Sequence, residues 1–277
     1  MTSEIYPDLN LPSLSRDFFG NLCVFTDKQL FDSLRLRIAF TTRVGGVSTV
    51  PFDSLNLSSY VGDDQDSVDK NIALIKEAFS VSCILRPKQV HGCEIIRVCD
   101  NSNMEQIYAA CEAGADAIML DTHDIAALLC FADCVPVILV SPTRRISVVH
   151  AGWKGVRSHI VESAFSSLVD LDKKQGIETA SKINVYIGAH IKDCCFEASE
   201  EIKENFVSEF SANVIAKSGN VSLQNCIVEA LLKLGADEDR ICSLNKCTMC
   251  SPDEFFSFRY SDGICGRHGA FAHIGRR

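Results

Sequence analysis

The sequence has no run of basic residues and no long apolar stretch, and these two absences limit its partners. Its 27 Lys and Arg residues are dispersed among 36 Asp and Glu residues, which gives a net charge of −9. Nucleic acids and anionic membranes bind clustered positive charge, so neither is expected as a partner. The longest apolar stretch, residues 125–140, is interrupted by Asp133 and Pro136. It is also shorter than the roughly 20 residues that a membrane span needs.

The N-terminal residues have neither the basic region nor the apolar region of a secretory signal, which predicts a cytoplasmic protein. In a reducing compartment the 14 cysteines are expected to be thiols, most of them packed as small hydrophobic residues. The apolar runs are all typical of a core, so no surface patch indicates an obligate protein partner.

Motifs that would place the chain in the commonest enzyme classes are also missing. There is no Walker A sequence, no G-x-G-x-x-G and no G-x-S-x-G, so nucleotide-cofactor and serine-hydrolase functions have no support. The seven histidines are too few for a multicopper laccase. The H-x-E…P-C-x-x-C signature of the zinc deaminases is absent as well.

Four helices are expected from apolar spacing. Asp63 or Asp64 is expected to cap a helix that ends at Phe79, with apolar residues at helical intervals. The other three are a helix after Gly155 with an apolar stripe from Val156 to Leu168, one around Phe206, and one over residues 223–234 that Gly235 ends.

Eight strands are expected, in clusters between the separated helices. That arrangement favours a layered α+β domain over a doubly wound sheet. The expected strands are Leu36–Phe40, Glu94–Val98, Asp116–Leu120, Ile125–Phe131, Val135–Val140, Ile146–His150, Ile183–Ile187 and Phe255–Tyr260.

The stretch from Phe131 to Val156 carries the densest chemistry. Asp133 and Cys134 precede one apolar strand, and His150 closes the next, just before a glycine-containing turn. A carboxylate, a thiol and an imidazole at strand ends are typical of an active site, because a core needs none of them there. Burying His150 at the end of an apolar strand requires a polar partner.

His91 is a further candidate, in the segment Gln89–Gly92. Residues 91, 134 and 150 are separated by 43 and 16 positions, so no local metal-binding spacing exists and only the fold can bring them together. On the residues alone, Cys134 and His150 also fit a metal-free nucleophile–base pair.

Two arginines lie in segments that suit anion binding. Arg43 follows two threonines in a glycine-rich turn, where a guanidinium beside backbone N–H groups makes an oxyanion site. The alternative is a hairpin turn with a solvated arginine. Arg259 ends an aromatic run and either extends to solvent from a strand edge or enters the site.

Two cysteine patterns are expected to be incidental. Cys247 and Cys250 have the spacing of a redox or zinc motif, but no second C-x-x-C accompanies them. Cys194 and Cys195 are adjacent and are not expected to bond to each other.

These motifs resemble the YfiH/DUF152 family, whose members were once called multicopper polyphenol oxidases or laccase-domain proteins. The resemblance runs in the family's order from about Arg37 to Ile274 and therefore covers nearly the whole chain. It is carried by these segments: Thr41–Arg43, Gly45–Ser48, Ser54–Leu57, Val61–Asp64, Gln89–Gly92, Phe131–Val156, Cys247–Thr248, Phe255–Arg259 and Gly266–His268.

The resemblance implies a fold, a domain division and a set of site residues. The fold is a single layered α/β/β/α sandwich similar to the cytotoxic necrotizing factor toxins, here over residues 21–277 after a loosely ordered segment 1–20. His91, Cys134 and His150 match the family's metal-site positions, and two imidazoles with one thiolate suit Zn²⁺ better than copper. These three and Asp133 are the catalytic candidates; Arg43, Asn56 and Arg259 are the candidates for substrate or phosphate binding.

The activity that the resemblance implies is that of a purine nucleoside enzyme. It would cleave adenosine, inosine, guanosine or methylthioadenosine with phosphate to give base and a ribose 1-phosphate, and would deaminate adenosine. Asp133 would be a general acid/base or would anchor a ligating histidine, and we favour the catalytic role. The alternatives are a metal-free Cys–His hydrolase or deamidase, a copper-dependent phenol oxidase, and a non-catalytic partner-binding protein.

Overall fold

A computed structural model describes residues 8–276, which form two stacked six-stranded sheets. The first sheet is ordered β1-β2-β3-β12-β7-β4 and the second β11-β10-β8-β9-β6-β5. Most neighbours are antiparallel, and β4·β7, β5·β6 and β10·β11 are parallel. The strands are β1 Ser15–Phe19, β2 Leu22–Thr26, β3 Leu36–Thr41, β4 Cys83–Leu85, β5 Ile95–Cys99, β6 Ala117–Asp121, β7 Ile125–Phe131, β8 Val135–Val140, β9 Ile146–Ala151, β10 Asn184–Ile187, β11 Ile241–Ser243 and β12 His268–Ile274.

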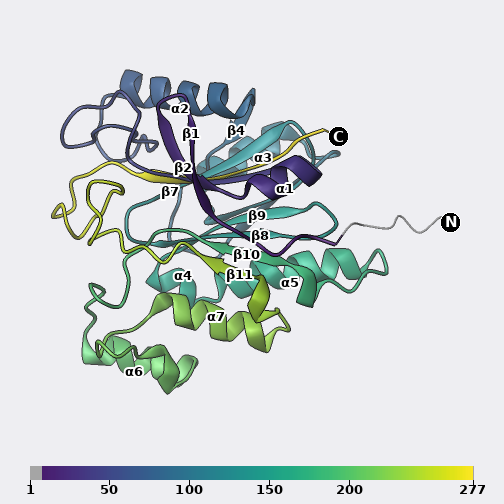
Figure 1. Cartoon of the computed structure of the whole chain (residues 1–277), viewed down its shortest axis with the longest axis vertical. Helices are drawn as coiled ribbons and strands as arrows, with labels where there is room; N and C mark the ends of the chain where they lie inside the picture. The colour runs from purple at the N-terminus through teal and green to yellow at the C-terminus, as the bar shows by residue number, and fades with distance from the viewer. Residues whose placement is uncertain (1–7, 277) are drawn as a thin grey trace.

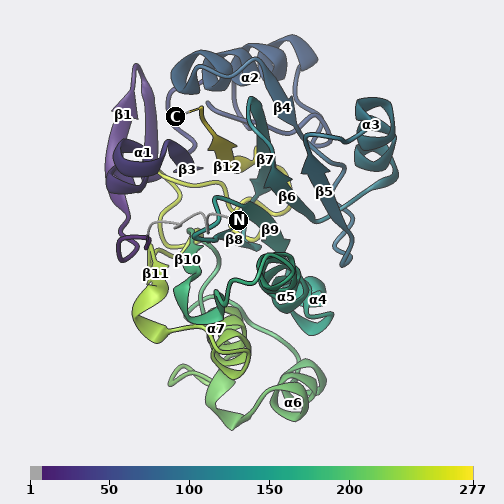
Figure 2. The ribbon, with the colours of Figure 1, turned by 90° about the vertical axis from the view of Figure 1, so that its right-hand side faces the viewer.

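Helices cover the outer face of each sheet, so the layers follow the predicted order α/β/β/α (Figure 1). The apolar stripe of α2 packs on the first sheet, and those of α5 and α7 pack on the second. Figure 2 shows α1 and α3 on opposite sides of the molecule, where both contribute side chains to the core between the sheets. The helices are α1 Lys28–Leu34, α2 Gln65–Phe79, α3 Met104–Ala113, α4 Trp153–Arg157, α5 Ile160–Lys173, α6 Glu200–Glu209 and α7 Leu223–Lys233.

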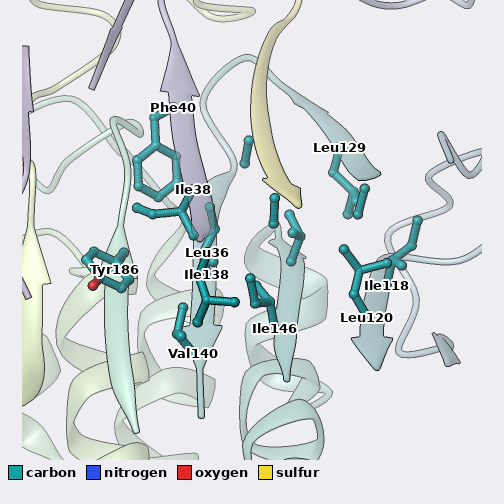
Figure 3. Close-up of a cluster of buried hydrophobic side chains, with 14 of the residues drawn as sticks. Leu36, Ile38, Phe40, Ile118, Leu120, Leu129, Ile138, Val140, Ile146 and Tyr186 are labelled. Atoms are coloured by element: carbon teal, nitrogen blue, oxygen red, sulfur yellow. The ribbon is translucent and has the colours of Figure 1, made fainter. Parts of the chain in front are cut away.

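The core between the two sheets is built from alternate residues of their strands (Figure 3). Leu36, Ile38 and Phe40 of β3 point into it, as do Ile138 and Val140 of β8, because side chains two residues apart share a face of a strand. Each is at most 1% exposed, and burying such a side chain stabilises the fold by about 1.5–3 kcal/mol. This core fixes the position of one sheet relative to the other, and with it the position of the residues that each sheet carries.

Most of the predicted elements are confirmed. Asp64 caps α2 by accepting a hydrogen bond from the Ser67 N–H, and Gly235 follows α7 with a positive φ of 90°. The predicted helix after Gly155 is instead two helices, α4 and α5, interrupted at His159, whose φ is 56°.

The predicted strand Phe255–Tyr260 is wrong. Phe255 and Phe256 are both buried, whereas Phe258 and Tyr260 are exposed, so the run lacks the alternation of a strand. Its backbone closes turns, with the Phe255 N–H bonded to the Ser251 carbonyl. The C-terminal strand of the first sheet is instead β12, which pairs with β3 and β7.

The N-terminal segment is more ordered than expected where the structure describes it. Ser15–Phe19 form the edge strand β1, and Leu9 is buried. Residues 1–7 of the predicted loose segment lie outside the described residues, and the domain boundary at residue 20 stays a prediction. Across residues 8–276, each helix is too short or too polar to cross a bilayer.

Candidate functional site

The fold brings His91, Cys134 and His150 together. His91 lies in the loop after β4, Cys134 on the short connection from β7 to β8, and His150 in β9. Their ligand atoms all lie within 4.8 Å of one another, and the two imidazole rings meet edge to face with centroids 4.9 Å apart. β8 and β9 pair so that Val135 faces Ala151, which places the residues just beyond them side by side.

Asp116 orients two of these three residues. Its Oδ1 lies 2.8 Å from His150 Nδ1, and its carboxylate also accepts the N–H groups of His91 and Gly92 at 3.0 and 2.7 Å. Burial raises the pKa of this carboxyl, but the hydrogen bonds from His150 and Gly92 outweigh it and hold the pKa below its usual value. Because Nδ1 of His150 is occupied, Nε2 is left to face Cys134.

Asp116 was not predicted as a site residue; its sequence position predicted only the first residue of a strand. The available signal was a carboxylate at the start of the apolar run Ala117–Leu120, where burial without partners is costly. Asp116 is fully buried, and its partners are the histidine and the loop that carries His91.

Cys134 and His150 favour each other's charged forms. Burial raises the pKa of the Cys134 thiol, but the neighbouring His150 and His91 outweigh it and lower the pKa to about 6. Burial lowers the pKa of His150, but the Cys134 thiolate and Asp116 raise it to about 9. Between these values the pair is thiolate and imidazolium, as long as no cation replaces the proton.

The backbone around the donors is crowded and strained. A Cβ on Gly152 would lie 2.9 Å from Cys134 Sγ and 3.0 Å from a His91 ring carbon, so only glycine fits there. His91 and Asp133 hold positive φ angles of 57° and 89°, which side-chain-bearing residues seldom adopt. Such conformations persist where the surrounding structure enforces them, as at many active sites.

Asp133 is held next to the donors by two hydrogen bonds. Its Oδ1 accepts from the Thr248 hydroxyl at 2.6 Å, and its Oδ2 accepts from the Arg259 N–H at 2.8 Å. The predicted alternative was that Asp133 anchors a ligating histidine. Asp116 does this instead, through its contact with His150 Nδ1. Asp133 lines the cavity described next and is 8% exposed.

A cavity of about 740 Å³ opens over these residues. Four cationic side chains line it and make it suitable for an anion: Arg86, Lys88, Arg259 and Arg267. Aromatic side chains suited to stacking on a flat ring line it too: Tyr60, Trp153, Phe196 and Phe258. The Arg259 guanidinium lies over the Phe196 ring, 5.2 Å from its centroid, and the Arg267 guanidinium lies 5.6 Å from that of Phe258.

Arg43 lies apart from the cavity lining. Its guanidinium donates to the carbonyls of Asp53 and Pro252, both at 2.8 Å, and pairs with the Asp53 carboxylate at 3.1 Å. It also stacks on Phe256, 4.6 Å from the ring centroid. These contacts make Arg43 a link between two loops, and it is not among the residues that line the cavity.

Asn56 is fully buried, and both ends of its amide have partners. Its oxygen accepts from the N–H groups of Ser58 and Arg267, and its nitrogen donates to the Ser58 carbonyl and Asp63. Asn56 thus holds the loops that carry Arg267 and the Ser58–Val61 wall in place, rather than facing the cavity.

The remaining histidines, among them His123, His159 and His190, are not part of the three-donor cluster. His159 pairs with Glu162 and Glu209, and His190 is buried with Nδ1 against the Gly188 carbonyl. His268 is buried between the rings of Phe131 and Phe255. Burial lowers its pKa to about 3, which keeps it neutral.

The donor set fits a metal ion. Two imidazoles and a thiol converge, one imidazole is turned by a buried carboxylate, and Gly152 leaves room beside the sulfur. Three protein donors leave one position open, as in catalytic zinc sites. Among the described residues lining the cavity there is no methionine to act as the weak axial ligand of a blue-copper centre.

Two sheets enclosed by helices, with a two-histidine, one-cysteine donor set under a basic cavity, define a class of α+β proteins with a candidate metal site. A family model described as multi-copper polyphenol oxidoreductase laccase matches residues 37–275. The chain belongs to this family, which includes the YfiH and YlmD proteins.

Its curated relatives are similar over most of their length. The chain is 33% identical to purine nucleoside phosphorylase YlmD of Geobacillus stearothermophilus over 86% of this chain and 89% of the relative. It is 28% identical to purine nucleoside phosphorylase YfiH of Escherichia coli over 83% of this chain and 90% of the relative. The crystal structure of G. stearothermophilus YlmD superposes with a TM-score of 0.79, at 28% identity, over 98% of this chain and 100% of that one.

Proposed function

We propose that the protein is a zinc-dependent purine nucleoside phosphorylase. The observation that carries the proposal is the single cavity in which three metal donors, a buried carboxylate and four cationic side chains face one another. The names of its relatives, purine nucleoside phosphorylases YlmD and YfiH, agree with this chemistry. The substrates we infer are adenosine, inosine, guanosine and methylthioadenosine with phosphate.

Phosphorolysis transfers the ribose from purine to phosphate. A phosphate oxygen bonds to C1′ as the C1′–N9 bond breaks, and that electron pair leaves on the purine, which takes up a proton. The ribose passes through a cation-like state, so an enzyme must hold the phosphate close and stabilise charge at both ends. The products are the base and ribose 1-phosphate.

The chain's own residues can meet each requirement. Arg86, Arg259 and Arg267 supply guanidinium donors that hold phosphate. The cavity aromatics stack on the purine and keep water from the ribose. Asp133, held by Thr248 and the Arg259 backbone, is our proposed general acid/base for the purine proton.

His91, Cys134 and His150 would hold the zinc ion. When bound there, zinc would supply Lewis acidity, which suits the negative charge on a leaving purine and, in a second reaction, the activation of water for attack at C6 of adenine. The second reaction is deamination of adenosine to inosine, which we propose as a side activity of the same cavity. We keep the prediction that the protein works in the cytoplasm.

Product analysis tests the proposal most directly. Purified, metal-quantified protein is incubated with adenosine, with and without phosphate, beside the His91→Ala variant. We expect adenine and ribose 1-phosphate only with phosphate and only from the unchanged protein. Inosine as the sole product would reassign the enzyme as a deaminase. Consumption of O₂ with phenols by copper-loaded protein would support the oxidase alternative instead.

A metal-free Cys–His hydrolase or deamidase is the second candidate, and one observation favours it. Cys134, His150 and Asp116 line up as thiolate, imidazolium and orienting carboxylate, the order of a catalytic triad. The triad gives no role to His91, which donates to the same thiolate from the other side. Turnover that survives chelation and is abolished by alkylating Cys134 would identify this activity.

A further inference from the structure

A second cluster of donors lies at the far edge of the second sheet. Cys194 and Cys195 occupy a turn after β10, and Cys247 and Cys250 occupy a turn after β11. β10 and β11 are parallel neighbours, so their C-terminal ends leave the sheet on the same side (Figure 1). A bridge between His190 and Cys247 continues the pairing and brings the two turns together.

The four sulfurs have the separations of a tetrahedral tetrathiolate site. All four Sγ atoms lie within 4.8 Å of one another; Cys250 Sγ is 3.4 Å from that of Cys195 and 3.8 Å from that of Cys194. Zinc–sulfur bonds of about 2.3 Å in a tetrahedron place the sulfurs about 3.8 Å apart. A disulfide would require about 2.0 Å, and all four are free thiols.

The surroundings of Cys247 are those of a metal-bound thiolate. Its Sγ accepts the Lys192 N–H at 3.5 Å and the N–H of Cys250, three residues along the turn. Burial raises the pKa of Cys247, but these N–H groups and hydrogen bonds from the thiols of Cys194 and Cys250 outweigh it and lower the pKa. The sulfurs are too close for several to ionise unless a cation is shared among them.

We propose that Cys194, Cys195, Cys247 and Cys250 bind one zinc ion in a closed, structural site. Four thiolates complete the tetrahedron and leave no position for substrate. Binding displaces the remaining thiol protons, so affinity increases with pH.

The site would fix two segments that form part of the active cavity. Thr248, inside the Cys247–Cys250 turn, donates to Asp133, and the Ile191 N–H bonds to the Asp133 carbonyl. The ring of Phe196, next to Cys195, packs against the Arg259 guanidinium. The cysteines are thus positioning residues for Asp133 and Arg259, and they touch neither substrate nor the first metal site.

Metal content of variants tests this site separately from the catalytic one. Full-length protein is purified under reducing conditions without chelator, and zinc and native thiols are counted for each form. The variants are Cys194→Ser and Cys250→Ser, whose thiols are exposed and contribute little packing, and the double variant His91→Ala/His150→Ala. Cys83→Ser, a thiol on the edge strand β4 of the other sheet, is the matched control.

We expect two zinc ions per chain in the unchanged protein and in Cys83→Ser. One ion should be lost in Cys194→Ser or Cys250→Ser, and one should remain in the histidine variant, in which no cluster residue has been changed. With Co²⁺ in place of zinc, the remaining ion in the histidine variant should show the intense sulfur-to-metal absorption of a tetrathiolate. Loss of all metal from the histidine variant, with the four cysteines reacting as free thiols, would overturn the proposal. So would iron as the bound metal, or a disulfide within the cluster in protein purified under reducing conditions.

Discussion

Within residues 8–276 the protein has two clusters of candidate metal donors, and they differ in composition and in what surrounds them. The cluster of His91, Cys134 and His150 mixes nitrogen with sulfur and opens into a cavity. The cluster of four cysteines is all sulfur and lies on turns at a sheet edge. An incomplete donor set leaves a position for chemistry, whereas a complete one ties chain segments together. Our two proposals therefore assign a catalytic role to the first cluster and a structural role to the second.

The largest expected effect comes from removing a donor at the open site. His150→Ala should lower kcat/KM for phosphorolysis by more than about 100-fold, because losing a ligand costs more than losing a residue that orients one. It should also remove one metal ion per chain without affecting the cysteine cluster. Steady-state kinetics and metal analysis check both points, and near-normal kcat/KM would contradict the assignment.

A substitution at Asp116 tests whether the orientation of His150 and of the His91 loop matters for the open site. Asp116→Asn should weaken zinc binding or activity about 10–100-fold, because an amide cannot accept hydrogen bonds from both His150 and the His91 loop on the same two oxygens. Competition with a chelator measures the affinity. Asp121→Asn, at the other end of β6 and paired with arginines, is the control that should leave this affinity unchanged.

The cationic side chains of the cavity should affect the binding of phosphate rather than the binding of metal. Arg259→Met should raise KM for phosphate about 10–100-fold with a smaller change in kcat, because a hydrogen-bonded charge contributes about 1.5–3 kcal/mol. Arg43→Met should instead lower the melting temperature and leave KM for phosphate unchanged, because Arg43 binds loop carbonyls. A reversed result would restore Arg43 as the phosphate ligand.

Thiol acidity distinguishes Cys134 of the open site from Cys194 of the four-cysteine cluster in metal-free protein. Cys134, with its pKa lowered to about 6, is a thiolate above that pH and a thiol below it. Burial and neighbouring thiols raise the pKa of Cys194 to about 11, so it is protonated at neutral pH. Iodoacetamide should therefore label Cys134 at a nearly constant rate down to about pH 6 and Cys194 slowly until strongly alkaline pH. Peptide mapping by mass spectrometry follows both, and equal labelling at pH 7 would contradict the difference.

The smallest effect on activity is expected at Thr248, which lies in the Cys247–Cys250 turn and bonds to Asp133 beside the open site. Thr248→Val removes the hydroxyl that holds Asp133 and should reduce kcat about 5–10-fold, the equivalent of one hydrogen bond of about 1–1.5 kcal/mol. Thr248→Ser keeps the hydroxyl and should restore most of the rate. If Val and Ser behave alike, the contact contributes nothing to positioning Asp133.

Local signals predicted much of the fold. Asp64 at the start of α2 and the β-branched runs of β8 and β9 were enough to place these elements. β12 was missed because His268–Ile274 mixes glycine and histidine with apolar residues. Phe255–Tyr260 was predicted in its place because an aromatic run resembles a strand, although its burial does not alternate.

The site was less accessible to sequence reasoning. His91, Cys134 and His150 came together only through a family resemblance, since their spacing carries no metal signal. Asp116 and the four-cysteine cluster were missed because their contacts join residues far apart in sequence. Cys195 and Cys250, for example, are 55 positions apart and meet only because β10 and β11 pair in parallel.

The connection from β7 to β8 is only Ala132, Asp133 and Cys134, yet it crosses from the first sheet to the second. His150 belongs to the second sheet, and His91 follows the edge strand of the first. An ion held by these donors would therefore link the two sheets to each other. Its binding energy enters the unfolding equilibrium of both sheets at once, by RT ln(1 + [metal]/Kd), or about 4 kcal/mol at a thousandfold excess over Kd. Loading the open site should delay melting of the whole domain as one cooperative unit.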